Sequence, residues 1–195
     1  MKLNKTSKMV YMSLLVATSL VLSLIERMLP IPFIAPGAKL GLANLVIMLS
    51  IYTLDSYKDS FKVLMLRIFL STMLSGSMSS FLYSSLGGIL SFTTSVILKE
   101  SLKEKVSIIG VSSAAAVFHN IGQLIVASII LNNIHVFLYL PILSVAGIGT
   151  GIFIGLSANY IICHLENFLT LRTATPPIIK PNYLNSFFIR KIRDF

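Results

Sequence analysis

Three hydrogen-bonding side chains lie within five residues near the middle of a long apolar segment. They are His119, Asn120 and Gln123, and the segment covers residues 106–131. A single buried histidine usually only packs, but three such side chains at one depth favour the lining of a polar cavity. Imidazole and amide groups both donate and accept hydrogen bonds, so they suit a polar solute. Packing alone is the alternative.

Two basic residues extend this set. Arg67 lies inside the apolar run 63–70, although it could instead extend toward the cytoplasmic side beside Lys62. Lys39 stands in a Pro- and Gly-containing stretch just before Asn44, where it either pairs with an anion or is solvated in an outer turn. A Lys/Arg pair suits an anionic ligand, and apolar walls suit a ring or a prenyl chain. The candidate ligand-binding residues are therefore Lys39, Asn44, Arg67, His119, Asn120 and Gln123.

The usual patterns of catalysis and metal binding are missing from the sequence. It contains no G-x-x-x-x-G-K-[ST] phosphate loop and no G-x-S-x-G element. Its seven acidic residues form no Asp-rich cluster for Mg²⁺ on a diphosphate, and its three histidines lack metal-ligand spacing. We therefore expect neither an enzyme nor a metal or cofactor.

The elements that must position these residues are apolar helices. Hydrophobic residues make up 55% of the 195 residues and charged residues only 12%, whereas a soluble domain is about a quarter charged. A helix needs about 20 residues to cross ~30 Å of hydrocarbon. We predict an all-α integral membrane protein, a compact bundle of about six transmembrane helices. The apolar segments are residues 9–29, 40–54, 61–75, 79–98, 106–131 and 136–165, of which the second and third are short for a full crossing.

The positions of the basic residues predict the orientation. With the N-terminus inside, nearly all Lys and Arg fall in cytoplasmic segments, and the outer segments hold Arg27 and Lys39. This bias predicts cytoplasmic N- and C-termini in the cell membrane, and it explains the net charge of +9 without nucleic acid. We expect a transmembrane domain over residues 1–165 and a basic cytoplasmic tail over 166–195 that lies on lipid headgroups.

Small residues recur at four-residue spacing in several segments. Such spacing places them along one helix face, where a neighbouring backbone can approach closely. We expect tight packing there, or surfaces that slide during a transport cycle. The residues are Gly76, Ser80, Ser84 and Gly88, then Gly147, Gly151 and Gly155, with Ser13 and Ala17 as a shorter pair in the first segment.

Several strings over about residues 10–160 are specific in combination. They are Ile25-Glu26-x-x-Leu29-Pro30, Pro36-Gly37-Ala-Lys39-Leu-Gly41-Leu-Ala-Asn44, Arg67, Phe81-Leu-Tyr83-Ser84-x-x-Gly87-Gly88 and Phe118-His119-Asn120-x-Gly122-Gln123. They resemble the Gx transporter family, which is also labelled heptaprenyl diphosphate synthase component I. That family is similar to the substrate-binding S components of energy-coupling-factor (ECF) transporters.

The resemblance implies a fold and partners. S components are bundles of about six helices that bind a vitamin or similar solute near the outer side, and they associate with a transmembrane coupling protein and two ATPases. Small residues on their first helix contact the coupling protein, and the matching positions here are Ser13 and Ala17, with Ser replacing a usual alanine.

Two functions stay open, and a third is conceivable. We favour an S-component-like subunit that binds a small, anionic vitamin-like, isoprenoid or quinone-related ligand. The alternative is a non-catalytic membrane accessory of heptaprenyl diphosphate synthase, in menaquinone side-chain synthesis, with a soluble prenyl diphosphate synthase as its partner. The third is a subunit of a quinone- or flavin-linked electron-export assembly. The ligand, the partners and the oligomeric state do not follow from the sequence.

Overall fold

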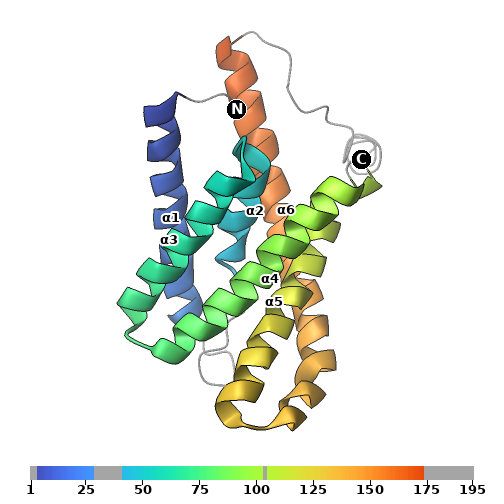
Figure 1. The fold of residues 1–195 in the computed structure, drawn as a ribbon. Coiled ribbons are helices and arrows are strands. Elements are labelled where there is room, and N and C mark those ends of the chain that lie inside the picture. Colours follow the sequence, from blue (N-terminus) through green and yellow to red (C-terminus); the bar gives the residue numbers. More distant parts are fainter. Residues whose placement is uncertain (1–3, 29–40, 103–104, 174–195) are drawn as a thin grey trace.

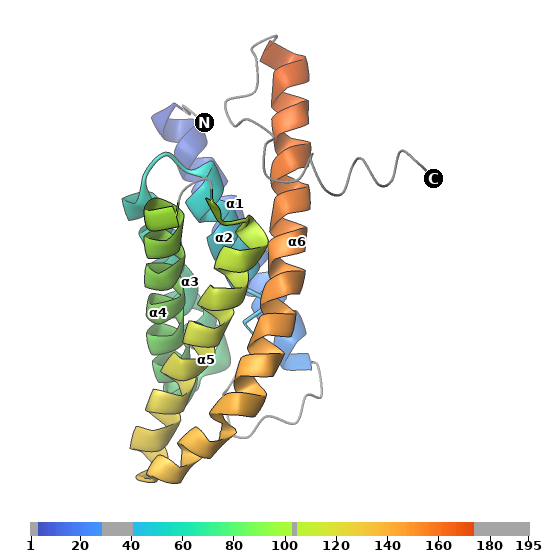
Figure 2. The ribbon, with the colours of Figure 1, turned by 90° about the vertical axis from the view of Figure 1, so that its right-hand side faces the viewer.

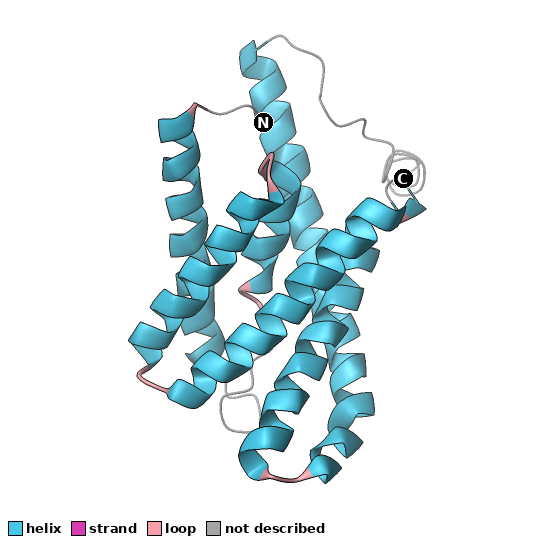
Figure 3. Ribbon diagram, in the orientation of Figure 1, coloured by secondary structure: helices cyan, strands magenta, loops and turns pink. Residues whose placement is uncertain are grey.

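The computed structural model describes residues 4–28, 41–102 and 105–173, and these form helices and no strand (Figures 1 and 3). The predicted all-α fold is confirmed. The six α-helices are α1 (Lys5–Met28), α2 (Asn44–Thr53), α3 (Tyr57–Ser75), α4 (Met78–Leu102), α5 (Ile108–Leu131) and α6 (Leu140–Thr173), and a 3-10 helix, η2 (Ile134–Tyr139), precedes α6.

The helices differ in how much of a bilayer they can cross. Four segments are long and apolar enough to span it: α1, α4, α5 and the η2–α6 segment. The 10 residues of α2 reach only ~15 Å, about half of the hydrocarbon thickness. Helix α2 is therefore too short to cross the membrane by itself, and Figure 1 shows it starting part-way along the bundle. The chain is a multi-pass membrane protein.

The start of α1 and the end of α6 lie at the same end of the bundle (Figure 1). Lysines at the start of α1, at the start of α3 and at the end of α4 gather there, so we call this the lysine-rich end. Lys8 and Lys62 both contact Asp59 at this end. The charge bias predicts that it faces the cytoplasm.

The bundle has two parts, which we call the first half (α1–α3) and the second half (α4–α6). Within the second half, α5 packs along both α4 and α6 (Figure 2). The first half is joined to it where α3 meets α4 and where α2 meets α6.

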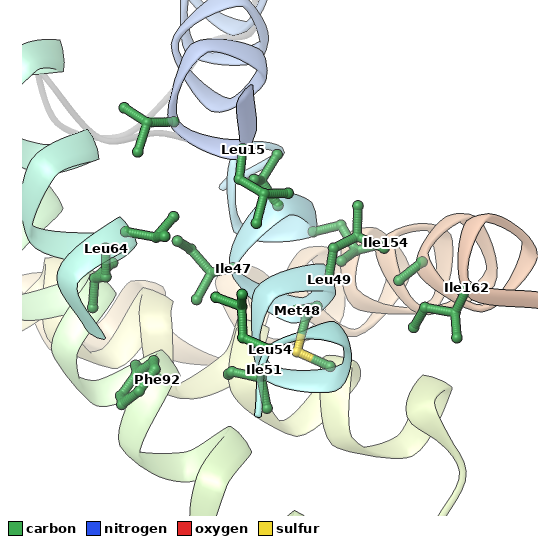
Figure 4. Close-up of a cluster of buried hydrophobic side chains, with 14 of the residues drawn as sticks. Leu15, Ile47, Met48, Leu49, Ile51, Leu54, Leu64, Phe92, Ile154 and Ile162 are labelled. Carbon is green, nitrogen blue, oxygen red and sulfur yellow. The ribbon is translucent and has the colours of Figure 1, made fainter. Parts of the chain in front are cut away.

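The apolar core surrounds α2, which is buried on all sides. Seven of its ten residues are buried, including Val46, Met48 and Ile51. Figure 4 shows this core, in which α2 contributes Ile47 and its neighbours while the other helices surround it. A helix that is apolar all round suits either a protein core or contact with lipid, and α2 takes the core position. The enclosure fixes α2, and with it the place where α2 begins.

Glycines of α6 bring its backbone against α5. A Cβ at Gly151 would lie 2.5 Å from the Ser113 Cα, and one at Gly155 would lie 2.6 Å from the Ile109 Cα. A Cβ at Gly147 would lie 2.7 Å from Asn120 Nδ2. These glycines therefore sit where two helix backbones touch.

The other small residues have different roles. Gly76 does not lie on the packing face expected for it: it ends α3 with φ +60°, and nothing lies within 4 Å of a Cβ placed there. Glycine suits this left-handed position because it has no Cβ, so Gly76 terminates the helix. Gly88 does pack against α3, beside Leu64, and Ser84 is half-buried. Ser13 and Ala17 are exposed on α1.

The domain boundary expected at residue 165 falls within a helix. The 34 residues of α6 continue to Thr173 and extend ~51 Å, well beyond ~30 Å of hydrocarbon. The rest of the expected tail, residues 174–195, lies outside the described residues.

Candidate functional site

The site forms where α2 begins inside the bundle. We call it the polar junction and define it by Glu26 of α1, Gly41 and Asn44 at the start of α2, Arg67 of α3, and His119 and Gln123 of α5. Gly41 has φ +84°, which only glycine adopts readily, and its carbonyl accepts a 2.8 Å hydrogen bond from the Asn44 N–H. This turn places backbone polar groups deep between the helices.

Arg67 connects α3 to the start of α2. Its Nη1 donates a 2.9 Å hydrogen bond to Asn44 Oδ1, and the residue is only 5% exposed. A side chain that extended to the lysine-rich end would be more exposed. The alternative of an arginine that reaches the membrane surface is therefore wrong, and the guanidinium lies inside the bundle.

Glu26 is a member of the junction that the sequence reasoning missed. It was not among the candidate ligand-binding residues, and α1 continues through it to Met28. The residue is 4% exposed, and its Oε1 accepts a hydrogen bond from the Gly41 N–H. It also lies within electrostatic range of Arg67. The available signal was the carboxylate itself, because an acid at the end of an apolar helix usually has a partner.

His119 and Gln123 supply the α5 side of the junction. The two residues are one turn apart, so they share a face, and Gln123 Nε2 lies 2.9 Å from His119 Nε2, within hydrogen-bonding distance. The imidazole sits between two glycines. A Cβ at Gly87 of α4 would lie 2.9 Å from His119 Nδ1, and one at Gly41 would lie 3.3 Å from His119 Cδ2. Larger residues at either position would displace the ring.

Asn120 does not belong to the junction, although we expected it there. Its Nδ2 donates a 2.7 Å hydrogen bond to the Leu143 carbonyl of α6, and the amide packs against Gly147. Adjacent residues of an α-helix point about 100° apart, so Asn120 faces α6 while His119 faces α2 and α4. Its role is to join α5 to α6.

The remaining predicted members and chemistries can be placed briefly. Lys39 and the prolines that precede it lie outside the described residues. Within residues 4–28, 41–102 and 105–173, no three His, Cys, Asp or Glu side chains converge on a point where a metal ion would fit. The junction instead combines one carboxylate, one guanidinium and three side chains that donate and accept hydrogen bonds, which suits the binding of a polar group.

A second polar group lies far from the junction, at the lysine-rich end. Asp59 accepts from Lys62 at 2.9 Å and forms an ion pair with Lys8 of α1. These hydrogen bonds, first that of Lys8 and then that of Lys62, hold the pKa of Asp59 below its ordinary value. Nearby, Lys99 Nζ donates 2.7 Å to the Ile51 carbonyl at the end of α2. Both contacts tie helices together.

Comparison with known proteins adds one finding. The family model described as heptaprenyl diphosphate synthase component I matches residues 15–161, which include all of the polar junction. No curated protein and no solved structure matches the chain. Because the match covers most of the sequence, the chain belongs to the heptaprenyl diphosphate synthase component I family.

Proposed function

We propose that this chain is a membrane subunit that binds a small polar solute at the polar junction, in the manner of the S component of an ECF transporter. The observation that carries the proposal is the buried contact between Arg67 and Asn44 at the start of a half-length helix. Ionisable groups inside a membrane bundle are costly and usually serve function. Helices that begin at mid-depth and present their first residues to a site are a recurring feature of transporters.

The position of the junction also favours a transport role. Glu26, Asn44 and Arg67 come from the first half, whereas His119 and Gln123 come from the second. A solute held by both halves would stabilise one arrangement of them over another, which is the requirement for coupling binding to movement. Ser13 and Ala17, exposed on α1 at four-residue spacing, are the proposed contact for a transmembrane coupling protein and its ATPases.

The test is retention of a solute through purification. The protein is extracted in mild detergent, and both its small molecules and its protein partners are identified by mass spectrometry. His119→Ala and Arg67→Lys should lose the solute, since the first removes the imidazole and the second keeps the charge but loses the planar donors that face Asn44.

Asn120→Ala is the matched control, because it alters the neighbouring residue on the same helix but faces α6. It should retain the solute in the same amount as the wild type. Size-exclusion profiles and melting temperatures show that each variant is folded. Equal retention by all three variants would remove the junction as the site.

The family name favours a second function. It names a component of heptaprenyl diphosphate synthase. In this second proposal the chain is a non-catalytic membrane subunit whose partner is a soluble prenyl diphosphate synthase. The lysine-rich end would be the surface that meets such a partner. Synthase activity should then depend on co-expression of this chain, and the synthase should co-purify with it. Unchanged prenyl diphosphate synthesis after deletion of the chain would exclude this function.

A further inference from the structure

Glu26 occupies an unusual place for a carboxylate. It lies on α1, whose outward face is apolar and exposed and whose packing is against α2 and α3. The inward face of α1 carries a buried polar stripe, Ser19, Ser23 and Glu26, spaced as one helix face. Of the three, only Glu26 is ionisable, and its carboxylate lies at the start of α2. Its burial therefore needs a specific explanation.

The groups around the Glu26 carboxylate are those that hold acids in general. The Gly41 N–H donates to its Oε1, and the positive end of the α2 helix dipole lies three residues further along. The Arg67 guanidinium is buried and lies within electrostatic range of Glu26. It donates a hydrogen bond to Asn44, which carries no charge. A backbone N–H together with a guanidinium binds carboxylates and phosphates alike.

We propose that Glu26 is an internal substitute for the acidic group of the solute. In the solute-free protein its carboxylate balances Arg67; when the solute binds, the carboxylate or phosphate of the solute takes this place. This inference rests on the proposed function and deepens it, because it identifies the solute as a carboxylic acid or a phosphate. It also gives Glu26 a role in specificity, since a neutral solute cannot replace the carboxylate without leaving Arg67 uncompensated.

The exchange has a structural consequence. The contact between Glu26 and Gly41 is a direct polar link from α1 to the start of α2. A solute that replaces Glu26 breaks this link and leaves α1 held by its apolar contacts, by the hydrogen bond from Tyr11 to Thr53 at the end of α2, and by the ion pair of Lys8 with Asp59. Occupancy of the site is thereby communicated to the helix that carries Ser13 and Ala17.

The test is chemical rescue with small acids. Glu26→Ala removes the carboxylate and leaves room for acetate beside Arg67. Purified Glu26→Ala protein is melted in detergent with sodium acetate, with sodium phosphate, and with acetamide in sodium chloride at the same ionic strength. Acetamide has the shape of acetate without its charge. We expect acetate or phosphate to raise the melting temperature by about 3 °C or more, and acetamide to leave it unchanged.

Three controls identify the position of the acid. Wild-type protein should not respond, because Glu26 already occupies the place. Glu100→Ala, which removes an exposed carboxylate at the lysine-rich end, should not respond either. The double variant Glu26→Ala/Arg67→Ala should lose the response, because the guanidinium that holds the acid is gone. Rescue by acetate alone would favour a carboxylic acid as the solute, and rescue by phosphate alone would favour a phosphate ester.

Absence of rescue in Glu26→Ala would overturn the inference, as would an equal response in the double variant. If no buffer yields folded Glu26→Ala protein, the same melting assay is carried out on Glu26→Gln, which keeps the side-chain volume. Phosphate should then stabilise Glu26→Gln more than the wild type, and an equal response would again overturn the inference. These failures differ from failure of the proposed function: a wild type that retains a neutral solute through the junction would sustain the function and refute the role of Glu26.

Discussion

The two halves of the bundle are held together by different means. In the second half, helix backbones touch: a Cβ at Gly122 would lie 2.8 Å from the backbone nitrogen of Gly87, and Gly151 and Gly155 bring α6 equally close to α5. In the first half, side chains make the connections, including the Arg67–Asn44 hydrogen bond and the Glu26 contact with Gly41. Backbone contacts have no rotamers to change, whereas side-chain contacts can be exchanged for others.

This difference assigns a task to each half. His119 and Gln123 stand on the closely packed second half and offer a fixed set of hydrogen-bonding groups. Glu26, Asn44 and Arg67 stand on the first half, where their charges and amides can rearrange around a ligand. The binding site proposed at this boundary would combine a rigid wall with an adjustable one. Substitutions in each half test this contrast.

Breaking the charge balance of the first half should have the largest effect. Arg67→Met leaves the Glu26 carboxylate buried without its guanidinium, and we expect a loss of about 4 kcal/mol in the free energy of unfolding. The double variant Arg67→Met/Glu26→Gln should regain most of this loss, because no uncompensated charge remains. Melting curves in detergent measure both. Purely additive effects of the two substitutions would show that these residues do not interact.

Breaking the backbone contact of the second half should lower the free energy of unfolding slightly less than Arg67→Met does. Gly151→Val places its Cβ against the Ser113 backbone, and we expect a loss of about 3 kcal/mol, at the upper end for overpacking, because backbone cannot move aside as a side chain can. Gly149→Val is the matched control two residues away, where nothing lies within 4 Å. The same denaturation assay compares the two variants. Equal destabilisation would contradict the close packing of α5 and α6.

A smaller effect is expected where the halves meet at the lysine-rich end. Lys99 of α4 donates to the Ile51 carbonyl of α2, and its Nζ lies 4.4 Å from the centre of the Tyr52 ring. Lys99→Met removes both contacts and should cost about 1 kcal/mol. Lys58→Met, on an exposed lysine at the same end, should change the unfolding free energy little. An unchanged free energy of unfolding in Lys99→Met would mean that apolar packing alone joins the halves at this end.

The smallest effect concerns Asp59 and depends on pH. Its pKa is lowered in the folded protein, so the ionised carboxylate stabilises the fold above its ordinary pKa of about 4, and this stabilisation is lost as pH falls through the lower folded-state pKa. Asp59→Asn should cost less than about 1 kcal/mol at neutral pH. Melting temperatures of both proteins should converge as the pH drops below about 4. A constant difference from pH 7 to pH 3 would assign the effect to shape instead of charge.

Much of the helix pattern could be predicted from the sequence, because apolar composition and length decide it. All six apolar segments became helices, and the second, expected over residues 40–54, forms the ten-residue helix α2. The contact faces of Gly147, Gly151 and Gly155 also follow from spacing, since a four-residue repeat stays on one side of a helix. Gly76 was misjudged because spacing continues across a helix end, where the residue instead terminates α3.

The polar junction was harder to predict because its partners are distant in the chain. Whether His119 or Asn120 faces the junction depends on how α5 is rotated about its axis, and the sequence of α5 does not determine this rotation. Glu26 and Arg67 are 41 positions apart, and each alone resembles a residue near a membrane surface. Only the start of α2 inside the bundle brings them together, and this depends on the tertiary position of a helix too short to span.

Helix α6 is long enough that a small rotation at one end produces a large displacement at the other. Its ~51 Å rod is fixed to α5 along its glycines and runs from η2 to beyond the lysine-rich end. Because α6 is fixed to α5, the two helices would rotate together, and a rotation of about 5° about the η2 end would move Thr173 through ~4 Å. A small rotation at the η2 end thus becomes, at Thr173, a displacement larger than the width of a water molecule.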